Sequence, residues 1–73
     1  MIKQGNIYKE KNPPYYRHDE GNFVITSQMF TTCWILYQTG ETDRVSIDWV
    51  KKDCVLVKEC ASWREAINDE AFK

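Results

Sequence analysis

Hydrophobic and polar residues alternate over several short stretches of the chain, and this pattern predicts β-strands. The expected strands are residues 5–9, 23–28, 33–38, 44–46 and 54–58. In the second, one face carries Phe23, Ile25 and Ser27, and the other carries Val24, Thr26 and Gln28. In the third, one face carries Cys33, Ile35 and Tyr37, and the other carries Trp34 and Leu36. Because both faces of the third strand are apolar, we expect it to be central and covered on both sides.

A short helical turn is expected between the last two strands. Ser46 is a favourable N-cap residue, Asp48 follows it early, and Lys51 and Lys52 come late. This order of charges suits the dipole of a helix, in which the first turn is positive and the last turn negative. The segment from Ser46 to Asp53 therefore predicts a one-turn helix before the last strand.

The end of the chain predicts a second helix. Ser62 is followed three residues later by Glu65, which is a capping-box pattern, and we expect a helix over residues 62–72. Its apolar stripe comprises Trp63, Ala66, Ile67 and Ala71. Because a helix of this length is not stable alone in water, we expect it to dock on its own sheet or on another chain.

These elements together indicate a mainly β (α+β) fold. Five short strands, a one-turn helix before the last strand and a short C-terminal helix suggest a small, partly open barrel of the SH3-like kind. A roll with a helix packed across it is the alternative architecture. We expect one domain over residues 1–73, with the barrel at about residues 5–58.

Parts of the sequence resemble a known group of proteins. The run Trp34-Ile35-Leu36-Tyr37, a turn, and then residues 45–58 are similar to small bacterial and bacteriophage SH3-like proteins of mostly unknown function. Gly5-Asn6-Ile7-Tyr8 matches their opening strand, and Phe23-Val24-Ile25 matches the next strand. The likeness covers residues 5–58 as a pattern, while the tail helix and Pro13-Pro14 depart from it.

This resemblance implies a fold and a phage or prophage source, but it carries no catalytic residue. By analogy with other small phage proteins, it implies an inhibitor or adaptor that binds a bacterial host protein. The expected location is then the cytoplasm of the bacterial host cell. No run of about 18 apolar residues occurs and the N-terminus has no apolar leader core, so we expect neither a membrane span nor a signal peptide.

Charge and residue types argue against most catalytic and metal chemistry. Cys33, Cys54, Cys60 and His18 lack the close Cys pairs of zinc sites, and we expect structural thiols and a solvated turn histidine. The paired carboxylates at Asp19-Glu20, Glu41/Asp43 and Asp69-Glu70 lie in turns or the tail beside basic residues. We therefore expect no enzyme activity, no cofactor and no metal.

Aromatic residues are the main functional signal. The chain has 73 residues, of which 14% are aromatic, and a core this small cannot bury them all. Interfaces favour Tyr, Trp, Phe, Met and Arg, and Pro13-Pro14 stiffens one candidate loop. The expected protein-binding residues are Tyr15, Tyr16, Arg17, Met29, Phe30 and Trp34. Trp49 is expected to fill the core, although Trp49 or Trp63 is a possible third anchor.

Two other functions remain open from the sequence. A nucleic-acid-binding barrel would use Lys9, Lys11, Tyr15, Tyr16 and Arg17, but the net charge is −1, with 10 basic and 11 acidic residues. Such a barrel predicts salt-sensitive binding to oligonucleotides. A structural homo-oligomer subunit, such as a homodimer, predicts stability that depends on protein concentration.

Overall fold

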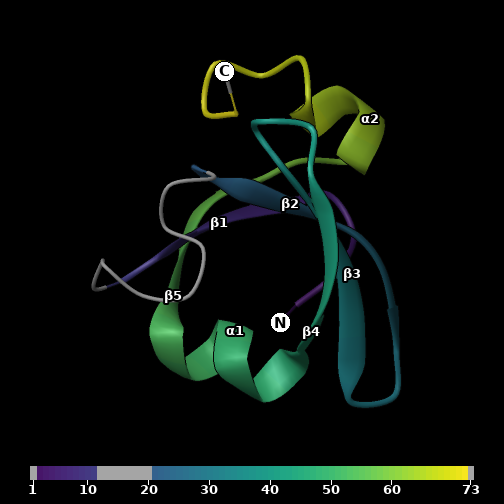
Figure 1. Cartoon of the computed structure of the whole chain (residues 1–73). Coiled ribbons are helices and arrows are strands. Elements are labelled where there is room, and N and C mark those ends of the chain that lie inside the picture. Colours follow the sequence, from purple (N-terminus) through teal and green to yellow (C-terminus); the bar gives the residue numbers. More distant parts are fainter. Residues whose placement is uncertain (1, 12–20, 73) are drawn as a thin grey trace.

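The computed structural model describes residues 2–11 and 21–72, in which five strands form one antiparallel sheet (Figure 1). The strands are β1 (Asn6–Glu10), β2 (Phe23–Met29), β3 (Thr32–Tyr37), β4 (Thr42–Ser46) and β5 (Cys54–Glu59). Helix α1 (Ile47–Asp53) lies between β4 and β5, and helix α2 (Trp63–Ala66) follows β5. The order across the sheet is β4-β3-β2-β1-β5, so β4 and β5 are its edges. The expected mainly β fold with five strands and two short helices is confirmed.

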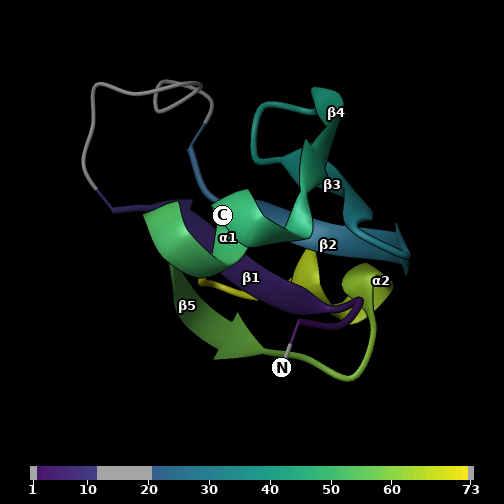
Figure 2. The ribbon, with the colours of Figure 1, turned by 90° about the horizontal axis from the view of Figure 1, so that it is seen from below.

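Helix α1 forms where the sequence predicts it. The backbone N–H of Trp49 donates to Oγ of Ser46 at 3.0 Å, which satisfies one of the free donors at the start of the helix. Asp48 lies in the first turn, and Lys51 and Lys52 lie in the last turn. Seen from the end that carries α1, β3 and β4 lie to one side of this helix and β5 to the other (Figure 2).

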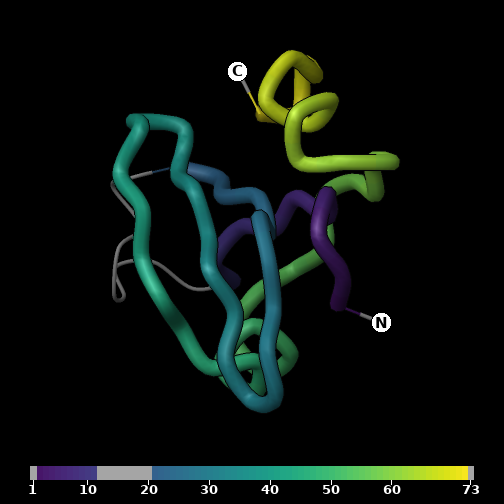
Figure 3. The backbone as a smooth tube through the Cα atoms, turned by 90° about the vertical axis from the view of Figure 1, so that its right-hand side faces the viewer, coloured from purple at the N-terminus to yellow at the C-terminus, as the bar shows by residue number. Residues whose placement is uncertain are grey.

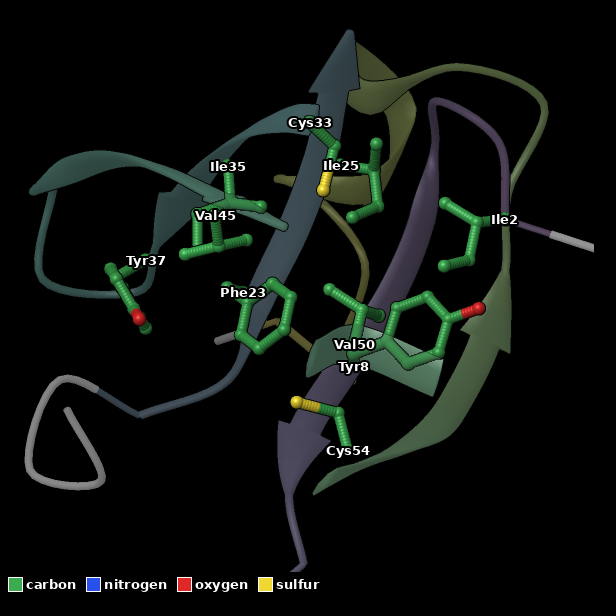
Figure 4. Packing of buried hydrophobic residues seen from close by; sticks show 10 residues of the cluster. All are labelled: Ile2, Tyr8, Phe23, Ile25, Cys33, Ile35, Tyr37, Val45, Val50 and Cys54. Atoms are coloured by element: carbon green, nitrogen blue, oxygen red, sulfur yellow. The ribbon is translucent and has the colours of Figure 1, made fainter. Parts of the chain in front are cut away.

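The inner face of the curved sheet holds the larger of two hydrophobic clusters (Figure 4). Its buried members are Ile2, Tyr8, Phe23, Ile25, Cys33, Ile35, Tyr37, Val45, Val50 and Cys54. Phe23 is central, because its ring stacks on Tyr8 at 6.0 Å and on Trp49 at 5.7 Å, and meets Tyr37 edge-on at 5.6 Å. Trp49 therefore fills the core, as expected, although part of its ring stays exposed.

Within residues 2–11 and 21–72, the outer face of the sheet is covered at one end, by α2 and the C-terminal segment. Ile7 and Val24 from the sheet pack there with Ala66 and Phe72, and Leu36, Trp63 and Ile67 are partly buried around them. The tail is fixed by Asn22 Nδ2, which donates to the Ala71 carbonyl oxygen at 2.9 Å. Figure 3 shows α2 and this tail at one end of the molecule and the β2–β3 turn at the other.

The expected C-terminal helix over residues 62–72 is too long. Its start is confirmed, since the Glu65 N–H donates to Oγ of Ser62 at 3.3 Å, but α2 ends at Ala66. After it the chain makes turns, in which Oδ1 of Asp69 accepts from the Ala71 N–H at 2.9 Å. Asn and Asp side chains compete in this way with helical hydrogen bonds, which explains the early end. Of the two expected docking sites, the chain's own sheet or another chain, the structure shows the helix packed on its own sheet.

A β-bulge in β2 corrects the expected strand faces. Ile25 lies opposite Ile35, but Ser27 lies opposite Trp34, so Thr26 is an extra residue in β2. Ser27 is therefore on the outer face with Val24, and not on the inner face with Phe23 and Ile25. The alternation of apolar residues could not reveal this shift, because a bulge changes the register without changing the strand's composition.

Strand β3 is covered on both sides over only part of its length. Cys33, Ile35 and Tyr37 are buried on the inner face, as expected. On the outer face Leu36 packs against the cluster under α2, whereas 43% of Trp34 is exposed. The cover from α2 thus ends between Leu36 and Trp34, and the outer face beyond it is open.

Candidate protein-interaction surface

Four side chains form an exposed surface at the β2–β3 hairpin and the adjoining part of β4. We call Met29, Phe30, Trp34 and Arg44 the hairpin surface. Met29 is 62% exposed and Phe30 is 92% exposed. Trp34 lies directly opposite Arg44 on the neighbouring strand. Three of the residues predicted to bind protein, Met29, Phe30 and Trp34, are therefore exposed and belong to one hairpin.

Phe30 is held in an unfavourable backbone conformation at the hairpin tip. Met29 pairs with Thr32, so Phe30 and Thr31 form a two-residue turn. Phe30 has a φ of 57°, which Gly, Asn and Asp adopt readily and bulky residues rarely do. The chain thus has a strained, solvated phenylalanine where a small turn residue would be more stable, and such strain is typical of functional positions.

The bulge at Thr26 determines where Met29 points. Side chains along a strand alternate between its two faces, so without an extra residue Met29 would lie on the same face as Ile25, the inner one. With the bulge it faces the outer side, the side that carries Trp34. Oγ1 of Thr26 donates to the Trp34 carbonyl oxygen at 3.2 Å, which ties the bulge to β3. Bulges commonly redirect side chains in this way beside functional sites.

Arg44 supplies the one charged group of the hairpin surface. Its guanidinium carbon lies 5.7 Å from the centre of the Trp34 ring, in a cation–π contact. Arg44 makes no ion pair with any residue in the described ranges 2–11 and 21–72. Beside it, where β4 meets α1, is a hollow of about 290 Å³ lined by Arg44, Val45, Ser46 and Trp49.

The sequence around the hairpin contains no charge. From Gly21 to Gly40 there is no Asp, Glu, Lys or Arg, although 29% of the whole chain is charged. The cores of protein interfaces are depleted of charge and enriched in aromatic residues, Met and Arg. This uncharged run is the feature of the sequence that indicates the site. Residue types alone could not reveal that Arg44 belongs to it or that the bulge at Thr26 orients Met29.

The remaining predicted site residues divide into two groups. Tyr15, Tyr16 and Arg17 lie outside the described residues. Lys9 and Lys11 are exposed, and Nζ of Lys11 donates to the Lys52 carbonyl oxygen at 2.9 Å, at the end of α1. Lys11 therefore has a structural role there, and the acidic residue Asp53 adjoins the same helix end.

A second exposed apolar group lies on the edge strand β5. Val55, Leu56 and Val57 are each about two-fifths exposed. However, Val57 is an extra residue in the pairing with β1, and Lys58 and Glu59 follow it. Bulges and charges are devices that prevent an edge strand from pairing with another chain. The hairpin surface is therefore the stronger candidate for binding.

The thiols serve the core, as expected for Cys33 and Cys54. Both are buried and make no disulfide, and Cys60 is half-buried and also free. Burial raises the pKa of Cys33 to about 11. Burial, with the charge of Glu10 as a smaller cause, raises the pKa of Cys54 to about 12. At neutral pH these thiols are protonated and therefore weak nucleophiles.

No helix in the part of the chain that the structure describes is long and apolar enough to cross a membrane. The chain matches no family model, no curated protein and no solved structure.

Proposed function

We propose that this chain is a non-enzymatic protein-binding module and that the hairpin surface is its contact surface. The observation that carries the proposal is Phe30, which is 92% exposed at a φ of 57°. An exposed phenylalanine in a left-handed conformation costs stability, and a function at that position explains why it is there. Met29 precedes it in the chain, and Trp34 and Arg44 lie opposite each other on β3 and β4. These three are residue types that anchor interfaces.

The finer fold and the biological setting are part of the same proposal. A meander in which β1 pairs with both β2 and β5, with a short helix before β5, supports a partly open SH3-like barrel. The resemblance to small phage SH3-like proteins supports an inhibitor or adaptor that acts on a bacterial protein in the cytoplasm. The proposal assigns no cofactor.

The test is affinity capture from a bacterial lysate with four tagged forms of the chain. These are wild type, Phe30→Ala, Met29→Ala and Leu56→Ala, and each is used with and without nuclease. Leu56 is the matched control, because it is an exposed apolar side chain outside the hairpin surface. Removing an interface anchor typically costs 2 kcal/mol or more, which is about 30-fold in affinity.

The proposal expects one bacterial protein to be enriched by wild type and Leu56→Ala, and to be lost with Phe30→Ala, in both nuclease conditions. Equal enrichment by Phe30→Ala would contradict it. Circular dichroism of each variant shows whether a lost interaction is merely lost folding.

A nucleic-acid-binding barrel is the second candidate, and one observation favours it. An exposed Trp34 with a guanidinium over its ring is also suited to stacking on a base. Against it, the run from Gly21 to Gly40 contains no cation, and binding to phosphates needs several. If nuclease treatment removes the captured protein, or if wild type binds oligonucleotides with a steep salt dependence, this candidate replaces the first.

A further inference from the structure

We infer that the partner of the hairpin surface is a protein that presents a carboxylate beside an apolar patch, with the carboxylate bound against Arg44. This inference deepens the proposed function and rests on it. Three features of the described residues support it: the charge balance of the surface, the position of Arg44, and the hollow next to Arg44.

The positive charge of Arg44 determines which charge the partner must present to the hairpin surface. Arg44 is exposed, stacks on Trp34 and has no ion pair among the described residues. The other three members of the hairpin surface are apolar, so none of them would neutralise the guanidinium when binding removes its water. Because a buried, unpaired charge is costly, a well-matched partner must supply an anion at this position.

The anion is better provided by a protein carboxylate than by a nucleic acid. A phosphate backbone is bound through several cations in a row, whereas the hairpin surface has one. Its large apolar area, Met29, Phe30 and Trp34, instead matches the apolar core of a protein interface. A guanidinium also binds a carboxylate with two parallel hydrogen bonds, which gives direction as well as affinity.

A second copy of the chain fits this surface less well. A two-fold contact centred on Trp34 and Arg44 would bring the two copies of Arg44 toward each other. Like charges that face each other at an interface cost several kcal/mol. Charge complementarity therefore favours a different, acidic protein.

The hollow gives the carboxylate a place to bind. It is bounded by Arg44 on β4 and Trp49 on α1, and its volume is about 290 Å³. This is enough for one Asp or Glu side chain. Val45 and Trp49 in the hollow pack with the inner cluster, whereas Met29 and Trp34 lie on the outer face of the sheet. The carboxylate would therefore bind at the edge formed by β4, beside Arg44, while the partner's apolar patch covers the outer face.

The experiment is a selection of random peptides, displayed on particles, against the wild-type chain, followed by titration of the selected peptides. Binding is measured to wild type, Arg44→Gln, Arg44→Lys, Arg44→Glu, Phe30→Ala and the control Lys51→Gln. Lys51 is an exposed lysine on α1 that is not part of the hairpin surface. Selected peptides are also made with each acidic residue replaced by lysine.

The inference expects selected peptides with an Asp or Glu next to large apolar residues. Arg44→Gln should weaken their binding at least about tenfold, Arg44→Lys should weaken it less, and Lys51→Gln should leave it unchanged. Arg44→Glu should bind the lysine-substituted peptide better than the original one. This reversal cannot come from a general loss of folding.

The outcomes separate the inference from the proposed function. If the selected peptides require Phe30 but are indifferent to Arg44, or carry no excess of acidic residues, the inference is wrong and the proposed function stands. If they are indifferent to both Phe30 and Arg44, or if no peptide is selected, both are contradicted. Binding by a second copy would appear as a concentration-dependent mass in sedimentation, and it would overturn the choice of partner.

Discussion

At Phe30, the requirements of stability and of the proposed function conflict. Its backbone conformation favours a small residue, and its exposed ring contributes little to the fold. Both properties oppose folding, and both suit a side chain that enters a partner's pocket. The sequence predicted its exposure from the excess of aromatic residues, but no pattern in the sequence could reveal its positive φ.

The buried thiols provide a prediction about pH. Burial raises the folded-state pKa of Cys33 from 9.0 to about 11 and that of Cys54 to about 12. Below pH 9 both thiols are protonated in the folded and unfolded chains, so their contribution to stability is fully present. Above pH 9 the unfolded chain loses these protons first, and stability falls as the pH rises toward 11–12.

This dependence is measured by urea unfolding at pH 8, 9, 10 and 10.5. A Cys33→Ala variant should be less stable at pH 8, because it loses buried volume, but its stability should fall less between pH 9 and 10.5. The comparison with wild type cancels the effect of every ionisable group that the two proteins share. If stability falls equally in wild type and Cys33→Ala between pH 9 and 10.5, the pKa of Cys33 is not raised in the folded chain.

At the scale of elements, the sequence predicted strands and helix starts well and register poorly. The five strands and the N-caps Ser46 and Ser62 follow from local residue types. The bulges at Thr26 and Val57 depend on pairing between strands, and residue types within one strand do not encode it. The length of α2 depended on Asp69, whose side chain bonds to the local backbone.

The N-cap of α1 is a direct test of one element. Ser46→Ala removes the hydroxyl oxygen that accepts from the Trp49 N–H. We expect a loss of about 1 kcal/mol in the free energy of unfolding. Ser27→Ala, on the exposed part of β2, is the control and should change stability by less than about 0.5 kcal/mol. Equal effects in urea unfolding would show that Ser46 does not act as a cap.

The approach of β1 to the segment before α2 depends on a glycine. Gly5 has a φ of 96°, and a Cβ there would lie 2.5 Å from the carbonyl oxygen of Cys60. Gly40 has a φ of 95° with nothing within 4 Å of its Cβ position, so it provides a matched control. Gly40→Ala should cost about 1 kcal/mol from backbone strain alone, and Gly5→Ala should cost at least about 1 kcal/mol more. Similar losses in thermal unfolding would contradict this close contact.

At the scale of the whole molecule, the two faces of the sheet have different roles. The inner face is closed by α1 over the larger cluster, and the described part of the chain covers the outer face at one end, through α2. The open end carries the hairpin surface, so the proposed binding and the folding use separate parts of a small sheet. The sequence predicted that some aromatic residues must stay exposed, but the topology was needed to place them together.

If the partner is a different protein, the chain alone should be a monomer. A homo-oligomer gains stability with protein concentration, because association removes the free folded chain. With Arg44 opposing a two-fold contact, we expect the unfolding midpoint to be unchanged over a hundredfold range of concentration. A midpoint that rises with concentration would favour the structural homo-oligomer instead.

In the proposed function, Phe30 is present for binding and lowers the stability of the chain. The most direct measurement is the thermal unfolding midpoint of wild type, Phe30→Ala and Phe30→Gly, together with their binding to the captured protein. Alanine removes the ring but keeps a Cβ, which is strained at this φ. Glycine removes both the ring and the strain. We predict that binding is lost in both variants and that Phe30→Gly unfolds several degrees above Phe30→Ala, since about 1 kcal/mol corresponds to roughly 4–8 °C in a domain of this size. If Phe30→Gly still binds the captured protein, the ring of Phe30 is not needed for binding. If Phe30→Gly is less stable than Phe30→Ala, the backbone at this position is not strained.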